Sequence, residues 1–195
     1  MGSTLSSISV YSQVAKIYNQ QKKDGELQQT LEKIGETSGE MISEMSDIVW
    51  AINPRNDHMN NIIQRMDSFA RPLLQAKNIQ FEFSYDDAIP AINLQMDKRK
   101  NFYLIFKEAI NNAIKYSCCT KIIVTIKSEH NRLELFVSDN GKGFNIDNGH
   151  INSSKSLSGN GLKNMQMRAS EMKATFTIES QANNGTHIEL LVPIP

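Results

Sequence analysis

The chain has no excess of charge of either sign, no long apolar run and almost no cysteine. Its 195 residues include 21 Lys and Arg against 21 Asp and Glu, so no basic excess indicates a nucleic-acid partner. No run of about 18 apolar residues is present, and the sequence therefore predicts no membrane span. The first residues also lack the charged and apolar regions of a signal peptide.

The two cysteines and the missing phosphate motifs narrow the class of protein further. Cys118 and Cys119 are adjacent, which fits neither a disulfide framework nor a zinc site and favours a reduced, cytosolic compartment. The sequence contains no G-x-x-x-x-G-K-[ST], which excludes a P-loop. Gly159 and Gly161 follow a Ser-rich stretch instead of a strand, so they do not form a dinucleotide fingerprint.

The first fifty residues carry helical periodicity. Residues 2–19 have the pattern of an amphipathic helix, and residues 22–25 read as a polar turn. The next helix has a heptad seam, which requires a partner helix, and we expect a dimeric four-helix bundle. The alternative is a hairpin packed on a second domain of the same chain. The seam comprises Leu27, Leu31, Ile34, Ser38, Met41, Met45, Ile48 and Ile52.

The rest of the chain alternates between helical and strand patterns. Pro54 ends the second helix, and residues 55–58 form a hinge. A third helix over residues 59–75, distorted at Pro72, points Ile62, Ile63, Met66, Phe69, Ala70, Leu73 and Leu74 inward. Strands are expected over residues 79–83, 121–127, 133–139, 174–180 and 186–192. A further helix follows Leu162, and Asp97 or a neighbour caps the helix before residue 117.

These patterns predict an α+β fold in three parts. Residues 1–54 form an antiparallel helical hairpin for dimerisation, residues 55–58 are the hinge, and residues 59–195 form a catalytic domain. That domain is expected to be an α/β sandwich with one mixed sheet and one layer of helices.

One helix, over residues 101–117, carries the first candidate site. Its apolar stripe consists of Phe102, Ile105, Phe106, Ala109, Ile110 and Ala113. Glu108, Asn112 and Lys115 follow one another at i, i+4 and i+7, so an acid, an amide and an amine lie on one line of the helix. Such a line can hold a metal, water and phosphate. The alternative is a solvated face supported by the Glu108–Asn112 pair.

Three glycine motifs follow this helix. Asp139 precedes Gly141 and Gly143, which allow close backbone approach; the alternative for Asn140-Gly141 is a hairpin turn. Gly159-Asn160-Gly161-Leu162 leads into a helix, where free N–H groups suit a phosphate, or else serves as ordinary loop glycine. Gly185-Thr186 opens the last strand.

E-x-x-x-N on a helix, followed by D-x-G-x-G, G-x-G-L and G-T, resembles the ATP-binding domain of sensor histidine kinases. That domain belongs to the GHKL group of ATPases, with the Bergerat type of fold. The resemblance implies that Asn112 coordinates the Mg²⁺ that bridges the ATP phosphates, and that Glu108 positions or deprotonates the phosphoryl acceptor. It also implies that Lys115 and Tyr116 approach the phosphates.

The resemblance also assigns the adenine end of the site. Asp139 would accept a hydrogen bond from the adenine amino group, while Gly141 and Gly143 lie against the nucleotide. Residues 145–158, with Gly159, Gly161 and Leu162, resemble the ATP lid, and Thr186 matches the threonine that contacts adenine.

The hairpin resembles the dimerisation helices of the same class. These carry H-D-x-x-G-x-x-L, and Gly2 and Leu5 match its last two fixed positions. The phosphoacceptor histidine would then precede this chain, so we expect the fragment to dimerise and to bind ATP and Mg²⁺ without labelling itself. By resemblance this chain is the cytoplasmic part of a membrane-anchored sensor, and it forms a homodimer through its helical hairpin. The intact protein would pass phosphate to a bundle histidine and then to a response-regulator aspartate.

Two other functions remain open from the residues. One is a GHKL ATPase or an anti-sigma-factor serine kinase, and the heptad hairpin argues against both. The other is a non-catalytic dimerisation module with a decayed nucleotide site, and the presence of Glu108, Asn112, Asp139 and the glycines argues against it.

Overall fold

The structure is a computed structural model that describes residues 2–53, 55, 57–145 and 160–194. The chain divides into two compact units, Met1–Ile52 and Asn53–Pro195. Within the part of the chain that is described, no helix has the length and apolarity needed to cross a membrane.

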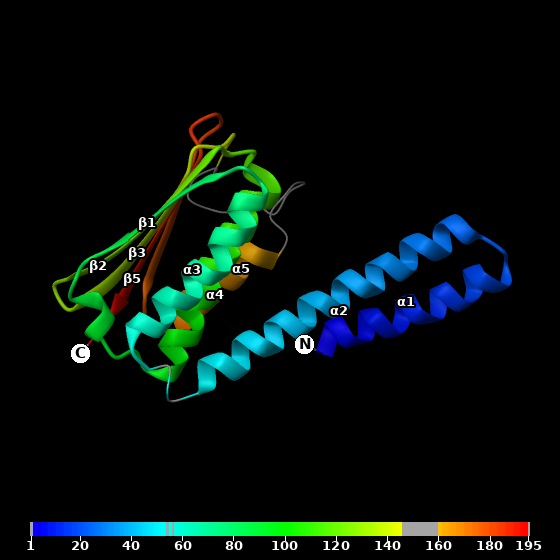
Figure 1. Ribbon diagram of the computed structural model, residues 1–195, viewed down its shortest axis with the longest axis horizontal. Helices are drawn as coiled ribbons and strands as arrows, with labels where there is room; N and C mark the ends of the chain where they lie inside the picture. Colours follow the sequence, from blue (N-terminus) through cyan, green and yellow to red (C-terminus); the bar gives the residue numbers. More distant parts are fainter. Residues whose placement is uncertain (1, 54, 56, 146–159, 195) are drawn as a thin grey trace. The chain divides into compact units, whose positions relative to one another are not determined.

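The first unit is a hairpin of two helices, α1 (Gly2–Gln20) and α2 (Asp24–Ile52) (Figure 1). The turn is shorter than predicted: Asp24 already begins α2, and Gly25 lies in its first turn. Lys22, with φ of 54°, supplies the left-handed residue that reverses the chain. The Lys23 N–H closes the turn on the Tyr18 carbonyl at 3.0 Å, so no glycine is needed there.

The hairpin buries little of its own apolar surface. Ala15 and Met41 are buried, at 7% and 8% exposure. Of the predicted seam, Leu31, Met45 and Ile52 remain 53%, 51% and 49% exposed. Further large apolar side chains exposed on the two helices are Leu5, Val10, Ile17, Ile42 and Val49.

The second unit contains a five-stranded sheet of order β1-β2-β3-β5-β4. The strands are β1 (Gln80–Tyr85), β2 (Lys121–Glu129), β3 (Arg132–Asp139), β4 (Thr175–Ser180) and β5 (Thr186–Pro193). β1 and β2 are parallel and all other pairs are antiparallel. His130 and Asn131, at φ of 49° and 59°, form the β2–β3 turn, because a two-residue turn of this hand needs positive φ at both positions.

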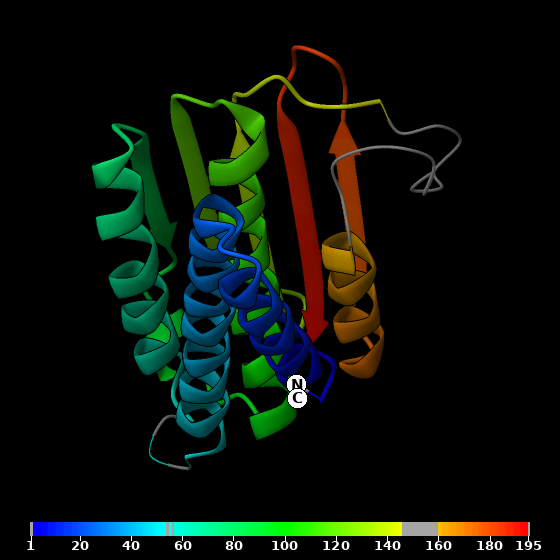
Figure 2. The same cartoon turned by 90° about the vertical axis from the view of Figure 1, so that its right-hand side faces the viewer.

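Three helices cover one face of this sheet, which confirms the predicted mixed sheet with one helical layer (Figure 2). They are α3 (Met59–Ala76), α4 (Met96–Asn112) and α5 (Asn160–Glu171). The predicted apolar stripe of α4 is buried throughout. Phe106 stacks on Phe83 of β1, with ring centroids 6.5 Å apart, and meets Phe69 of α3 edge-on at 6.4 Å. Phe106 of α4 therefore packs the helical layer against the sheet.

Two details of the helices differ from the prediction. Leu73 is 42% exposed, because α3 turns the stripe of Met66, Ala70 and Leu74 toward the core and leaves Leu73 at its edge. Pro72 lies inside α3, which nevertheless continues to Ala76. Asp97 does not cap α4: Gln95 is the N-cap and makes no side-chain capping bond. Asp97 lies instead in the first turn, where a negative charge favours the helix dipole.

Candidate functional site

The last turn of α4 meets the first turn of α5. Glu108 and Asn112 are half-buried on one face of α4, four residues apart. A Cβ at Gly161 would lie 2.1 Å from Glu108 Oε1 and 3.6 Å from Asn112 Nδ2. The structure therefore brings Glu108, Asn112 and Gly161 together, and the absence of a side chain at position 161 makes this approach possible. Glu108 and Asn112 are therefore partly covered by the start of α5 and do not lie on an open face of α4.

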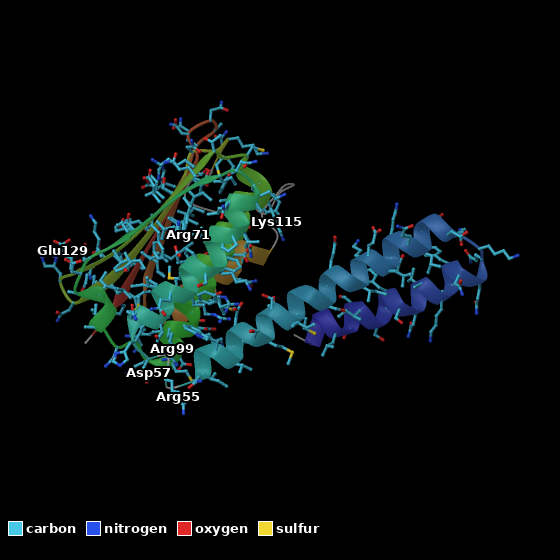
Figure 3. The ribbon with its side chains drawn as sticks, in the orientation of Figure 1. Arg55, Asp57, Arg71, Arg99, Lys115 and Glu129 are labelled. Carbon is cyan, nitrogen blue, oxygen red and sulfur yellow. The ribbon has the colours of Figure 1, made fainter. Side chains whose placement is uncertain are left out.

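The site helix does not run unbroken to residue 117. The α-helix ends at Asn112 and is followed by a π turn, η3 (Ala113–Ser117), which closes at Cys118 with φ of 55°. A π turn has more residues per turn than an α-helix, so Lys115 no longer continues the line of Glu108 and Asn112. Lys115 and Tyr116 are both exposed on this turn, at the end of the domain marked by Lys115 in Figure 3.

Asp139 ends β3 as a carboxylate that is only 8% exposed. Its Oδ1 accepts a hydrogen bond of 2.8 Å from the Gly141 N–H. Burial raises the pKa of Asp139. The Gly141 N–H, nearby His187, the Thr186 N–H and the Ser117 hydroxyl oppose the rise. A carboxylate has about four acceptor sites, so Asp139 can accept an amino group in addition to these donors.

The chain after Asp139 passes directly against the π turn. A Cβ at Gly141 would lie 2.3 Å from the Ser117 carbonyl oxygen, which accepts the Lys142 N–H at 2.8 Å. Gly143 has φ of 54°, and its Cβ would lie 2.1 Å from the Gln181 carbonyl oxygen. Both predicted glycines are thus required by backbone contacts of the fold. Ser117 joins the π turn to the segment that follows Asp139.

Asn140 has a structural role that the sequence does not reveal. Its Oδ1 accepts hydrogen bonds from the N–H groups of Thr120 (3.0 Å) and Lys121 (2.9 Å). Its Nδ2 donates to Thr120 Oγ1 at 2.9 Å. Asn140-Gly141 does not form a hairpin turn, because the strands paired with β3 are β2 and β5 and neither follows it directly. That alternative is wrong.

Thr186 stands opposite Asp139 in the β3–β5 ladder. Ser180 supports it: the two hydroxyl oxygens are 3.1 Å apart, and Ser180 Oγ also contacts the Gly185 carbonyl at 2.9 Å and the Phe144 N–H at 2.9 Å. Gly185 has φ of 73°, and a Cβ there would lie 1.9 Å from the Asp139 carbonyl oxygen. No sequence motif pointed to Ser180 or Ser117, because each acts through residues distant in the chain.

Two of the predicted site residues, and most of the predicted lid, belong elsewhere or are not described. Gly159 and residues 146–158 of the predicted lid lie outside the described residues. Leu162 is 4% exposed and is a core side chain of α5.

The donor set of the site suits a magnesium ion held mainly by a ligand. Among the described residues, no group of three or more His, Cys, Asp or Glu could hold a metal. Mg²⁺ usually takes one or two protein oxygens and completes its shell with phosphate and water. The amide oxygen of Asn112, half-buried beside Glu108, is compatible with that arrangement.

Comparison with known proteins finds a family that matches the second half of the chain. The family described as histidine kinase-, DNA gyrase B- and HSP90-like ATPase matches residues 97–195. Sensor protein VraS of Staphylococcus haemolyticus is 40% identical over 94 residues, which are 48% of this chain and 25% of that protein. VraS of Staphylococcus aureus matches with the same identity and coverage. The chain thus spans about a quarter of the length of these curated relatives.

Solved structures share the fold. The histidine kinase AdeS of Acinetobacter baumannii aligns with a TM-score of 0.65 at 14% identity, covering 94% of this chain and 95% of that one. The catalytic domain of histidine kinase ThkA aligns with a TM-score of 0.58 at 17% identity, covering 70% of this chain and 93% of that one.

Proposed function

The chain belongs to the histidine kinase-, DNA gyrase B- and HSP90-like ATPase family, and from that premise we propose that it is the catalytic core of a sensor histidine kinase. Its nucleotide domain binds ATP. In the intact protein the γ-phosphoryl group passes to a histidine on the helical bundle and then to an aspartate of a response regulator. The nearly buried Asp139 beside Gly141 and Thr186 is the observation that carries this proposal.

We assign adenine recognition to residues at the end of β3. The Asp139 carboxylate accepts a hydrogen bond from the exocyclic amino group, and Thr186 lies on the neighbouring strand to contact the base. Gly141 and Gly143 allow the close backbone contacts that hold the segment after Asp139 in place. A purine without that amino group leaves a buried carboxylate unpaired, which is the physical basis of selectivity for adenine.

The phosphates lie toward the α4–α5 junction. Asn112 would hold Mg²⁺, which supplies charge neutralisation for the phosphates. Glu108 would orient the acceptor or take its proton, and Lys115 and Tyr116, which are exposed on the π turn, would approach the phosphates. Gly161 offers its backbone N–H group in the first turn of α5. Phosphoryl transfer depends mainly on positioning and charge, which these residues supply.

Calorimetric titration with ATP and Mg²⁺ tests the proposal. The wild type should bind saturably. Asp139→Asn should weaken binding by about 10- to 100-fold, the worth of one hydrogen bond to a charged group. Asp67→Asn, which removes an exposed carboxylate on α3, is the matched control and should bind as the wild type does. Absence of wild-type binding, or equal affinity of Asp139→Asn, would refute the site.

The hairpin is proposed to form a homodimer in the cytosolic part of a membrane-anchored sensor. The half-exposed seam residues Leu31, Met45 and Ile52 support a second copy as their partner. Met45→Glu should weaken dimerisation at least about tenfold, since it places a charge in an apolar interface. The exposed neighbour Ser46→Glu adds the same charge outside the seam and should leave the dimer intact. Sedimentation analysis measures both; equal effects would contradict this interface.

A further inference from the structure

The segment that follows α2 is bonded to the segment that leads into α4. The Asp57 carbonyl accepts the Leu94 N–H at 3.0 Å, and the Ile92 carbonyl accepts the Met59 N–H at 2.9 Å. Between these bonds, His58 and Asn93 form an antiparallel bridge. The connection predicted as a hinge is therefore hydrogen-bonded into the second unit.

Arg99 adds a charged contact to this junction. It lies in the first turns of α4, is 0% exposed, and binds the Asp57 carboxylate through Nη1. Its Nη2 donates to the Asn53 carbonyl at 3.3 Å. Figure 3 shows Arg99 and Asp57 at one end of the domain, opposite the end marked by Lys115. A buried guanidinium depends on such partners, because loss of one leaves a desolvated charge incompletely compensated.

The same helix carries the candidate phosphate site. Glu108 and Asn112 follow Arg99 by nine and thirteen residues on α4, a rise of about 14 and 20 Å. Asn53 directly follows Ile52, the last residue of α2. The start of α4 is therefore hydrogen-bonded, through Arg99, to the segment that follows α2. The last turns of the same helix carry Glu108 and Asn112.

The ion pair between Arg71 and Asp67 serves as a comparison for the pair between Arg99 and Asp57, because it lies within one helix. Arg71 and Asp67 lie one turn apart on α3, with side chains 53% and 35% exposed, and join no other element through this pair. The pair Arg99–Asp57 joins residues 42 positions apart, and its guanidinium is wholly buried. Exposed pairs within one helix contribute little, whereas the buried Arg99 guanidinium depends on Asp57, whose own side chain is 50% exposed.

We propose that Arg99 is a positioning residue for the reaction of this site. Through Asp57 and the Asn53 carbonyl it holds the connection to α4, so that ligand binding at the end of α4 and the position of the end of α2 are coupled. This rests on the proposed function, since ATP is the ligand that biases α4. The coupling must be reciprocal, so a displacement of the hairpin also alters nucleotide affinity.

The chain contains its own probe. Trp50 is the single tryptophan and lies two residues before the end of α2. Its fluorescence is titrated with Mg·ATP while calorimetry on the same samples measures binding. The variants are Asp57→Asn, which keeps the shape and removes the charge, Asp57→Glu, which restores the charge, and Asp67→Asn as matched control. Asp57→Asn avoids the buried position itself, and its folding is checked by thermal melting.

The wild type and Asp67→Asn should show a saturable change in Trp50 emission with ATP. Asp57→Asn should lose this change while calorimetry still records saturable binding of Mg·ATP, because the variant leaves Glu108, Asn112 and Asp139 in place. Asp57→Glu should recover the change. A merely structural pair would lower the melting temperature and leave the Trp50 response intact.

Failure of the coupling and failure of the nucleotide site give different results. Calorimetric binding without any Trp50 response in the wild type overturns the coupling and leaves ATP binding standing. An unchanged response in folded Asp57→Asn overturns the role of the Arg99–Asp57 contact. No calorimetric binding in the wild type overturns the proposed function, and the coupling with it.

Discussion

Replacing Gly141 and Gly161 by alanine adds the same methyl group at two points of the site, yet the surroundings differ. At Gly141 the new Cβ meets the Ser117 carbonyl oxygen at 2.3 Å and Ser117 Cβ at 2.6 Å. At Gly161 it meets the carboxylate end of Glu108 at 2.1 Å. The first obstacle is backbone, and the second is the tip of a side chain that can rotate away.

The cost of the first substitution follows from how Ser117 is held. Its carbonyl accepts the Lys142 N–H at 2.8 Å, its hydroxyl donates to the Ala113 carbonyl at 2.7 Å, and that hydroxyl accepts the Cys119 N–H at 3.1 Å. Overpacking against such fixed groups costs about 1–3 kcal/mol, which lowers the melting temperature of a domain of this size by about 4 to 10 °C.

The substitution Gly161→Ala has two opposing effects on the free energy of unfolding. Moving the Glu108 carboxylate is inexpensive, and alanine in a helix is about 1 kcal/mol more favourable than glycine. We therefore expect the melting temperature of Gly161→Ala to stay within about 2 °C of the wild type. Function should nevertheless fall, because Glu108 is displaced from Asn112. The expected loss is in phosphotransfer to a supplied histidine-bearing hairpin.

Differential scanning calorimetry of the nucleotide-free chain measures both variants, with the transition of the second unit followed separately. A fall for Gly141→Ala and none for Gly161→Ala supports the contacts described. Equal falls, or a wild-type melting temperature for Gly141→Ala, would show that the segment after Asp139 does not press on the π turn as described.

Two further outcomes follow from the same region. Because burial raises the pKa of Asp139 above its ordinary value near 3.8, its stabilising contribution is present at low pH and lost as pH rises through the folded pKa. Asp139→Asn should therefore raise the melting temperature of the nucleotide-free chain at pH 7, with the gain shrinking toward pH 4; a gain independent of pH would contradict this. Asn140→Ala removes three hydrogen bonds and should cost about 1–3 kcal/mol in urea unfolding, and an unchanged midpoint would show that water replaces them.

The sequence predicted those features that depend on periodicity and on short motifs. The apolar stripe of α4 and the alternation of β2 and β3 follow from residues close together in the chain, and the structure confirms them. The glycines at 141 and 143 were predicted for nucleotide access, which stays a prediction, and the structure shows that close backbone contacts require them. The predictions that Leu73 points inward and that Asp97 or a neighbour caps α4 were wrong. Burial at the edge of a helix face and capping both depend on contacts with other elements, which the periodicity of the sequence does not reveal.

The sequence by itself determined which side chains are available to the candidate site, because the residue types at Glu108, Asn112 and Asp139, with their order and spacing, are local facts of the chain. Only the tertiary structure decided how these groups are held. Ser117 and Asn140 fix Asp139 through contacts across β2, the π turn and β3. Arg99 binds Asp57 across 42 positions. Contacts of that separation arise from packing of the whole domain, and no short stretch of sequence encodes them.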